Sequence, residues 1–256
     1  MKKFISVILI ALLIINISGA NVFADEGLNW YVKRAGNSRP IISEEHNFIE
    51  KYNSFYIDKK LSDTSCEKKI YLTFDAGYEN GNVAKILDIL KEKEVTSAFF
   101  LLDHIILKNT DLVMRMTDEG HMVCNHTKNH KDMTKLTDDE IKNNVSDLEK
   151  IYEQKTGREM SKYFRFPEGR YNERSLSTIN EMGYKTIFWS LAYADWDDRN
   201  QPKYSWAIEK LLENTHNGAV VLLHPTSKTN VEILPKLIDS WREKGYSFGN
   251  LDELTA

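Results

Sequence analysis

The sequence predicts an α/β fold in which parallel strands are joined by crossover helices. Two observations lead to this prediction: strand-like and helix-like segments alternate along the chain, and the strand-like segments end in polar residues. From residue 69 onwards, a short apolar run is followed by a longer segment with helical spacing of its apolar residues, and this unit occurs six times. Such repetition is typical of parallel sheets, because consecutive parallel strands need a crossover connection. The periodicity does not decide whether the strands close into a barrel.

The six units follow one another without a repeat or a low-complexity segment between them. The predicted strands cover 69–74, 96–102, 121–124, 162–166, 185–191 and 219–223. The predicted helices cover 82–94, 111–120, 137–157, 172–183, 204–218 and 231–245. The third helix has the clearest start, because Thr137 with Glu140 three residues later forms a capping-box pattern.

Residues 1–24 have the layout of a secretory signal peptide. Lys2 and Lys3 precede fourteen mostly apolar residues, and small residues then lead to a cleavage site after Ala24. The alternative is an uncleaved membrane anchor, but the apolar run is short for a span of about 20 residues. We therefore expect export, cleavage and no stable membrane insertion afterwards.

The rest of the chain divides into an extension and one domain. Residues 25–68 are polar and irregular, and we expect them to form an N-terminal extension lying on a domain of residues 69–256. Loss of Lys2 and Lys3 lowers the number of basic residues from 34 to 32, against 38 acidic ones. A negatively charged chain without a basic tail or stripe argues against nucleic acid as a partner.

Two cysteines, Cys66 and Cys124, occur in this exported chain. A disulfide between them is possible in an oxidising compartment. Cys124 lies in the apolar run of residues 121–124, where a free buried thiol is the simpler interpretation.

Polar side chains gather at the ends of the predicted strands. Because the loops that follow parallel strands meet at one face, and this face carries the active site in such folds, these residues are candidates for one site. A single strand-end His is more often a core or capping residue, and a single Asp is more often a helix cap. The convergence of five strands is what favours chemistry; the residues are Asp75, His126, His130, Arg165, Asp195, Trp196 and His224.

Four of these residues have a chemical reason to be present. His126 and His130 are four residues apart, which on a helical turn places both rings on one side, as in many divalent-metal sites. The pair alone is weak evidence for a metal. Arg165 can hold a neighbouring carboxylate ionised, and His224 titrates near neutrality, which suits a proton donor to a leaving group.

The same residues resemble the motifs of the polysaccharide deacetylases with a NodB-homology domain, carbohydrate esterase family four. The five motifs occur in order between residues 69 and 254, as TFDAG, HTKNH, RFP, ADW and LLH. The resemblance implies a distorted (β/α) barrel and a metal-dependent removal of acetyl groups from N-acetylated sugars.

The resemblance also implies a role for each matching residue. Asp75, oriented by Arg165, takes a proton from water, and His224, tuned by Asp195, protonates the departing amine. His126 and His130, with Asp75 as a further candidate, bind a divalent metal, which we expect to be zinc. The backbone N–H near Glu168 serves the oxyanion, and Trp196 forms an apolar wall of the groove, although an Asp-Trp pair can equally be packing.

Three positions depart from the family pattern, and one of them is Ala192, which aligns with an earlier aspartate of the fourth motif and leaves Asp195. Ala76 replaces an aspartate that is normally a metal ligand, and a methyl group cannot bind a metal, so the metal site is expected to be reduced. Glu168 replaces the tyrosine that follows the R-x-P motif.

A finer resemblance concerns the substrate. The stretches FDAGYENG and FWSLAYADW resemble the branch that deacetylates N-acetylmuramic acid in spore cortex peptidoglycan and leads to muramic-δ-lactam. The partner is then the peptidoglycan glycan strand, and the location is the cell wall or the forespore intermembrane space. Arg170 is the expected cation for the lactyl carboxylate, or else a solvated loop residue.

Two alternatives to this function stay open at the level of the sequence. One is a deacetylase of N-acetylglucosamine in peptidoglycan or chitin-like glycans, which would keep nearly the same motifs. The other is a glycan-binding pseudoenzyme, because loss of a metal ligand can begin the loss of catalysis. Retention of Asp75, Arg165 and His224 argues against the pseudoenzyme, since binding alone needs neither an acid nor a base.

Overall fold

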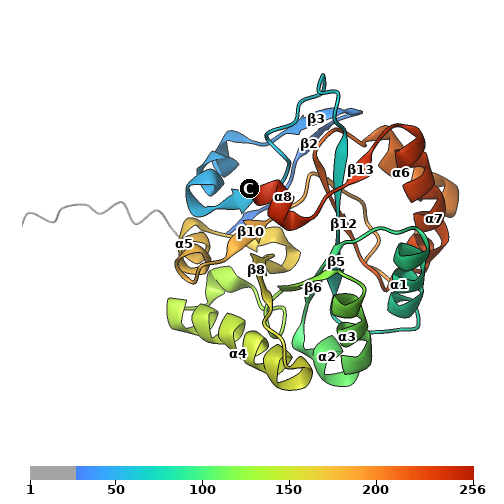
Figure 1. The fold of residues 1–256 in the computed structure, drawn as a ribbon. Helices are drawn as coiled ribbons and strands as arrows, with labels where there is room; N and C mark the ends of the chain where they lie inside the picture. The colour runs from blue at the N-terminus through green and yellow to red at the C-terminus, as the bar shows by residue number, and fades with distance from the viewer. Residues whose placement is uncertain (1–26) are drawn as a thin grey trace, which may run out of the picture.

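A computed structural model describes residues 27–256, and the predicted signal peptide lies outside them. The centre of the described part is a sheet of nine strands, all paired in parallel (Figure 1). In order across the sheet, the strands are β11 (Leu191–Ala192), β12 (Ala219–Leu223), β5 (Lys69–Ala76), β6 (Ala98–Leu101), β7 (Met122–Asn125), β8 (Ser161–Phe164), β10 (Lys185–Ile187) and β4 (Ser54–Phe55). The ninth strand, β13 (Ser247–Phe248), pairs with the first residues of β5.

The sheet is curled but not closed. Its outermost strands, β11 and β4, pair with no common neighbour in the described part of the chain, so one seam of the barrel has no strand-to-strand ladder. The distorted (β/α) barrel expected from the resemblance is confirmed. The sequence reasoning treated 185–191 as one strand, whereas β10 ends at Ile187 and β11 begins at Leu191 on the other side of the seam.

Helices surround the sheet on its outer side (Figure 1). All six predicted helices form, with shifted ends, and they are α1 (Val83–Glu92), α3 (Thr110–Asp118), α4 (Asp138–Thr156), α5 (Glu173–Glu181), α6 (Tyr204–Glu213) and α7 (Lys228–Glu243). Two short helices were not predicted, α2 (Asp103–Lys108) and α8 (Leu251–Thr255). The predicted capping box of α4 is present, since Thr137 accepts from the Glu140 backbone and Glu140 from that of Thr137. None of the helices in residues 27–256 is long and apolar enough to cross a bilayer.

Strand β5 shows how the pleat separates core from site. Ile70, Leu72 and Phe74 belong to the core cluster that packs against the outer helices. The residues between them face the inside of the barrel, because successive side chains of a strand point to opposite faces. Tyr71 belongs to the inner cluster that α8 completes through Leu251, so the buried apolar end of the barrel lies near the start of β5. Asp75 therefore lies on the inner face at the other end.

The N-terminal segment is part of the barrel wall. Its elements are β1 (Leu28–Asn29), the hairpin of β2 (Lys33–Ala35) and β3 (Ser38–Ile41), the 3₁₀ helix η1 (Glu44–Tyr52) and β4. β1 pairs with β9 (Arg170–Tyr171), and β4 extends the main sheet beside β10. Trp30 and Ile49 are buried in one cluster with residues of the later strands. The boundary expected at residues 68 and 69 stays a prediction, but the segment before it shares a core with the rest.

Cys66 and Cys124 are both free thiols, the first exposed and the second buried. The disulfide considered from the sequence is therefore not formed. Burial raises the pKa of the Cys124 thiol strongly, because a thiolate would lose its hydration there, so this cysteine behaves as an inert core residue.

Candidate active site

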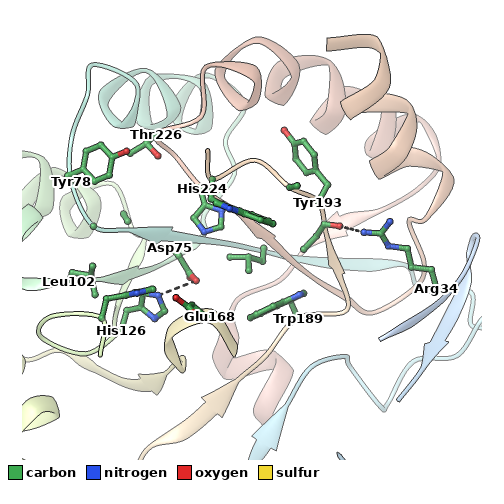
Figure 2. A pocket seen from close by; sticks show the side chains of 17 residues that line it. Arg34, Asp75, Tyr78, Leu102, His126, Glu168, Trp189, Tyr193, His224 and Thr226 are labelled. Carbon is green, nitrogen blue, oxygen red and sulfur yellow. Dashed lines mark hydrogen bonds and ion pairs between the residues drawn. The ribbon is translucent and has the colours of Figure 1, made fainter. Parts of the chain in front are cut away.

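A cleft of about 980 Å³ opens where the carboxyl ends of the parallel strands meet (Figure 2). Six of the residues proposed from the sequence line it: Asp75, His126, His130, Glu168, Trp196 and His224. Two others, Arg165 and Asp195, lie directly behind them and are almost fully buried. The position of the cleft is the one that parallel α/β folds use for their active sites.

Asp75 is held by an arginine that has no exposed surface. Arg165 donates from Nη1 to Asp75 Oδ1 at 2.8 Å, from Nη2 to the Thr73 hydroxyl and from Nε to the Ile187 carbonyl, each at 2.9 Å. Its guanidinium also lies 4.1 Å from the centre of the Phe100 ring. Burial by itself would raise the pKa of Asp75, but the charge of Arg165 and the neighbouring histidines outweigh burial and lower it. Asp75 is thus an ionised carboxylate, fixed in one orientation.

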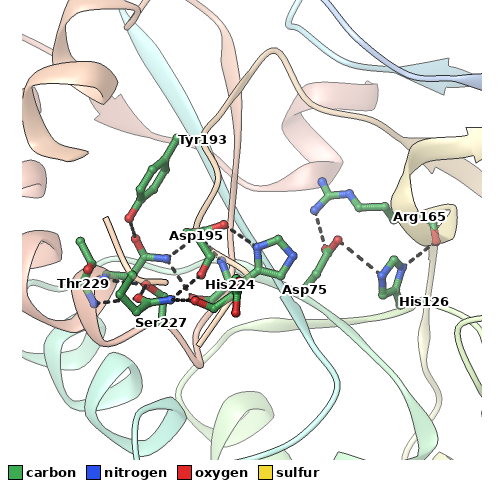
Figure 3. Close-up of polar contacts among 11 residues, drawn as sticks. Asp75, His126, Arg165, Tyr193, Asp195, His224, Ser227 and Thr229 are labelled. Atoms are coloured by element: carbon green, nitrogen blue, oxygen red, sulfur yellow. Dashed lines mark hydrogen bonds and ion pairs between the residues drawn. The ribbon is translucent and has the colours of Figure 1, made fainter. Parts of the chain in front are cut away.

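His224 is positioned by a second carboxylate (Figure 3). Its Nδ1 donates to Asp195 Oδ1 at 2.7 Å, and its backbone N–H donates to Oδ2 of the same residue at 2.8 Å. Asn230 donates a third hydrogen bond to Asp195 at 2.6 Å. Burial lowers the pKa of His224, but the Asp195 carboxylate raises it by more, so the net pKa lies above the ordinary value. The imidazole points toward Asp75 in Figure 3, with Nε2 as the nitrogen left for a reactant.

The two histidines of the HTKNH motif meet in a loop. Residues 126–130 form no helical turn, and the helical explanation for their spacing was wrong. Instead, Thr127 (φ 72°) and His130 (φ 56°) adopt left-handed backbone conformations, and the Thr127 hydroxyl accepts from the His130 N–H at 3.0 Å. The rings end with centroids 5.1 Å apart, at 74° to each other. The loop therefore brings the pair together as a helix would have done.

His126 is oriented as a metal ligand would be. Its Nδ1 donates to the Arg165 carbonyl at 2.8 Å, which leaves the lone pair of Nε2 on the side of Asp75, whose Oδ2 lies 3.5 Å away. Burial lowers the pKa of His126 to about 4, and His130 acts in the same direction, so the ring is neutral as metal binding requires. The donor chemistry of the two imidazoles fits a divalent metal.

A third protein ligand is not in place. Within residues 27–256, no three His, Cys, Asp or Glu side chains are grouped closely enough to hold a metal ion. Ala76 lines the cleft where the family pattern has a carboxylate, and Asp75 has one oxygen bonded to Arg165. The residues present therefore fit a metal held by the two histidines, with Asp75 as the nearest carboxylate.

Two substrate-binding residues expected from the sequence are at the cleft, and one is not. Trp196 is 62% exposed on the rim, with its ring centroid 6.3 Å from that of His224. Glu168 lines the cleft in a left-handed conformation (φ 56°). Arg170 does not line it, because its Nε lies 2.8 Å from Asp132 Oδ2 and holds that ion pair instead. The geometry gives no support to the role expected for Arg170.

Sequence reasoning missed several residues of the site. Trp189 lies in the fifth predicted strand and Tyr193 directly precedes the ADW motif, and both had an available signal because they belong to the stretch FWSLAYADW. Asn230, which is bonded to Asp195, and Thr73, which is bonded to Arg165, had no signal in the sequence. A buried polar residue is recognised only once its hydrogen-bond partners are known. Arg34 reaches the cleft from β2 in the N-terminal segment, which was expected to be irregular.

An ionised carboxylate, an oriented imidazole and a histidine pair at the open end of a parallel barrel are the groups that a hydrolase with a general base, a general acid and a metal requires. The family model described as polysaccharide deacetylase matches residues 62–187. The peptidoglycan-N-acetylmuramic acid deacetylase PdaA of Bacillus subtilis (strain 168) is 38% identical over 237 residues, which cover 92% of this chain and 88% of PdaA. The solved structure of B. subtilis PdaA, a family 4 carbohydrate esterase, superimposes with a TM-score of 0.84 at 37% identity, covering 90% of this chain and 97% of that one.

Two more distant relatives correspond to the two alternative functions considered from the sequence. The peptidoglycan-N-acetylglucosamine deacetylase PgdA of Listeria monocytogenes (strain 10403S) is 33% identical over 191 residues, 73% of this chain and 39% of PgdA. BA3943, a family 4 pseudoenzyme from Bacillus anthracis, has a solved structure with a TM-score of 0.70 at 26% identity, covering 79% of this chain and 69% of that one. The chain belongs to the polysaccharide deacetylase family, carbohydrate esterase family 4. It is a hydrolase of amide bonds, and metal dependence is general in this family.

Proposed function

We propose that this protein removes the N-acetyl group of N-acetylmuramic acid in peptidoglycan, and that the product amine leads to muramic-δ-lactam in spore cortex. The supporting observation is that one cleft carries a carboxylate, Asp75, oriented by Arg165 and, separately, an imidazole, His224, oriented by Asp195. The likeness to PdaA over 92% of the chain favours the muramic substrate. We propose the peptidoglycan glycan strand as the partner.

The reaction follows from the protonation states of the two pairs. Asp75, kept ionised by Arg165, removes a proton from a water molecule while the water oxygen attacks the acetamide carbonyl. The C–N bond then breaks, and His224 gives the proton on Nε2 to the departing amine, so that acetate and a free amine result. We assign the backbone N–H near Glu168 to the developing oxyanion. The free amine can then condense with the lactyl carboxylate of the same sugar, with loss of water.

The histidine pair is the proposed metal site. His126 and His130 would hold a divalent ion, proposed to be zinc, with Asp75 close enough to complete the set. When bound, the ion supplies electrophilic polarisation of the acetamide carbonyl. The Arg165 carbonyl orients the His126 ring for it, and the Thr127 hydroxyl fixes the backbone of His130.

The proposed location rests on the first residues of the chain. Residues 1–24 would direct export and be removed, so that the mature protein begins at Asp25 in an extracytoplasmic compartment. N-terminal sequencing of the secreted protein tests this, since a chain that retains Met1 would contradict it.

The Asp75→Asn variant tests the catalytic assignment. Acetate release from glycan strands of alternating N-acetylglucosamine and N-acetylmuramic acid should fall by about 10²- to 10⁴-fold, because the amide cannot take up the proton. Asp239→Asn, which removes a surface carboxylate paired with Lys93, is the matched control and should retain full activity. Turnover of Asp75→Asn near that of the wild type would remove Asp75 from the mechanism.

The same assay separates the alternatives. Mass spectrometry of the digested strands shows which sugar has lost its acetyl group, and loss from N-acetylglucosamine or from chitin oligosaccharides would favour the glucosamine-type deacetylase. No acetate release by the zinc-loaded wild type from any of these glycans would favour the glycan-binding pseudoenzyme.

A further inference from the structure

The cleft carries a cation that the hydrolysis does not use. Arg34 projects from β2 to the cleft, and its Nη2 donates to the Ala192 carbonyl at 2.6 Å. Figure 2 shows Arg34 and Tyr193 on one side of the cleft and Leu102 and His126 on the other. Arg34 is therefore away from the reacting end, and the mechanism gives it no task.

Arg34 lacks a carboxylate partner among residues 27–256. The other arginines of that part mostly have one; those in ion pairs are Arg115, Arg158, Arg165, Arg170, Arg174 and Arg199. Arg39 is bonded to main-chain carbonyls and Arg242 to that of Lys93, and neither lines the cleft. Arg34 is exposed, and one bond to a carbonyl leaves most of its five N–H groups available to a planar anion.

The hairpin that carries Arg34 is fastened to the barrel. Asn37 donates to the carbonyl of Leu212 in the last turn of α6, at 2.9 Å, and to that of Thr215 just beyond the helix, at 3.0 Å. Arg39 donates to the Asp58 carbonyl at 2.8 Å. These bonds and the one to Ala192 hold the guanidinium in place before a ligand arrives, which lowers the entropic cost of binding.

Aromatic surface lies between this cation and the reacting groups. Trp189 lines the cleft and is partly exposed. Tyr193 also lines it but is almost fully buried, and it contacts the half-exposed ring of Trp206, with centroids 6.2 Å apart. Aromatic rings beside a sugar-processing site offer apolar faces to successive sugar rings. The cleft thus continues past Asp75 and His224 in a form suited to a chain of sugars.

We propose that Arg34 forms a distal subsite for a carboxylate on a muramic residue of the same glycan strand, beyond the residue that is deacetylated. This inference rests on the proposed function, because it takes the peptidoglycan strand as the substrate. The carboxylate comes from one of two sources, the lactyl group of a peptide-free muramic residue or a stem peptide attached to it. The neighbouring carboxylates Asp75 and Glu168 lie at the reacting end and would repel such a group there, which favours Arg34, the only arginine or lysine among the described lining residues.

Binding to the metal-free protein tests the subsite without any need for turnover. Calorimetric titration of wild type with a peptide-free hexasaccharide of alternating N-acetylglucosamine and N-acetylmuramic acid gives the reference Kd. Arg34→Ala should raise this Kd about tenfold at low salt, the lower end expected for a charge-assisted contact at an exposed site. The increase should shrink as salt is added, because the interaction is screened. Arg242→Ala removes the same charge outside the cleft and should leave Kd unchanged.

Four further ligands identify the group that Arg34 binds. Chitin hexaose lacks carboxylates and should bind wild type and Arg34→Ala equally. A disaccharide of N-acetylglucosamine and N-acetylmuramic acid is too short to contact both the reacting groups and Arg34, so it should also bind the two proteins equally. A hexasaccharide with methyl-esterified lactyl groups should do the same if the lactyl group is the source. If only strands that carry stem peptides discriminate between the two proteins, the source is the peptide, and the subsite still stands.

Equal Kd values for Arg34→Ala and wild type with every carboxylate-bearing strand would overturn the subsite, as would the same increase with chitin hexaose. Failure of the proposed function gives a different result, because wild type would then release no acetate. The Kd values of wild type and Arg34→Ala could still be compared in that case.

Discussion

At the residue scale, Asp75 and Ala76 are neighbours that differ in charge. Asp75 faces the inside of the barrel and is bonded to Arg165. Ala76, the last residue of β5, is fully buried, packs in the core cluster and lines the same cleft as His126 and His130. The carboxylate proposed as the base is therefore retained, while the neighbouring carboxylate of the family pattern is replaced by a methyl group.

Ala76→Asp should strengthen metal binding. The substitution adds an anionic ligand beside His126 and His130, and we expect the Kd for zinc to fall at least about tenfold, equivalent to about 1.4 kcal/mol. Zinc titration of the metal-free proteins provides the measurement. Ala76→Asn adds similar volume without charge and serves as the control. Unchanged zinc affinity in Ala76→Asp would indicate that another group, with Asp75 the candidate, already completes the site.

At the element scale, the N-terminal segment supports one wall of the cleft. Trp30 donates from its backbone to the Gly169 carbonyl and from its indole to the Trp189 carbonyl, both at 2.8 Å. Gly169 has φ +65°, and a Cβ there would come within 2.7 Å of the Trp189 ring. The close contact and the left-handed backbone both require glycine at this position. The loop that presents Glu168 is therefore packed between Trp30 and Trp189.

Trp30→Ala should destabilise the protein and weaken catalysis. The indole is 5% exposed and stacks on Phe188 with centroids 4.4 Å apart, so its removal should lower the free energy of unfolding by about 3–5 kcal/mol. The value of kcat should fall as well, because Trp189 and the loop that carries Glu168 would no longer pack against the Trp30 indole. Urea unfolding and the acetate assay measure the two effects.

The neighbouring Tyr31→Ala is the control for this prediction. Tyr31 is 44% exposed, and its loss should change the free energy of unfolding by no more than about 1 kcal/mol. Equal effects of the two variants would show that Trp30 has no special part in attaching the segment.

At the scale of the whole molecule, two buried histidines outside the cleft link stability to pH. His121 accepts a hydrogen bond from the Ser97 N–H, and its other ring nitrogen has no partner in the described structure. His216 is bonded on both sides, to the Asn214 carbonyl and the Ser190 hydroxyl. Burial lowers the pKa of each to about 4, from an ordinary value of 6.5.

Because both folded-state pKa values are lowered, the unfolded chain binds more protons between pH 6.5 and about pH 4. The free energy of unfolding should therefore fall as the pH drops through this window, by at most about 3 kcal/mol for each histidine. Urea unfolding of the metal-free protein at about pH 7 and about pH 5 measures the difference. His121→Gln should reduce it, and a variant with the same pH dependence as wild type would exclude His121 as a source.

The pattern of residues along the chain was sufficient to predict the alternating strands and helices, because apolar periodicity depends on which face of an element is buried. It also placed Asp75, His126, His130 and His224 in one site, since the loops after parallel strands must meet at one face. The split of 185–191 into β10 and β11 was not predictable, because it depends on the position of the barrel seam.

The sequence by itself determined the kind of fold, the candidate reacting groups and the absence of a carboxylate at Ala76, because each depends on residue type and local spacing. Only the tertiary structure decided that Arg170 pairs with Asp132 while Arg34 reaches the cleft. It also decided that a left-handed loop, and not a helical turn, joins His126 to His130. Both depend on contacts between segments far apart in the chain, and local spacing carries no information about such contacts.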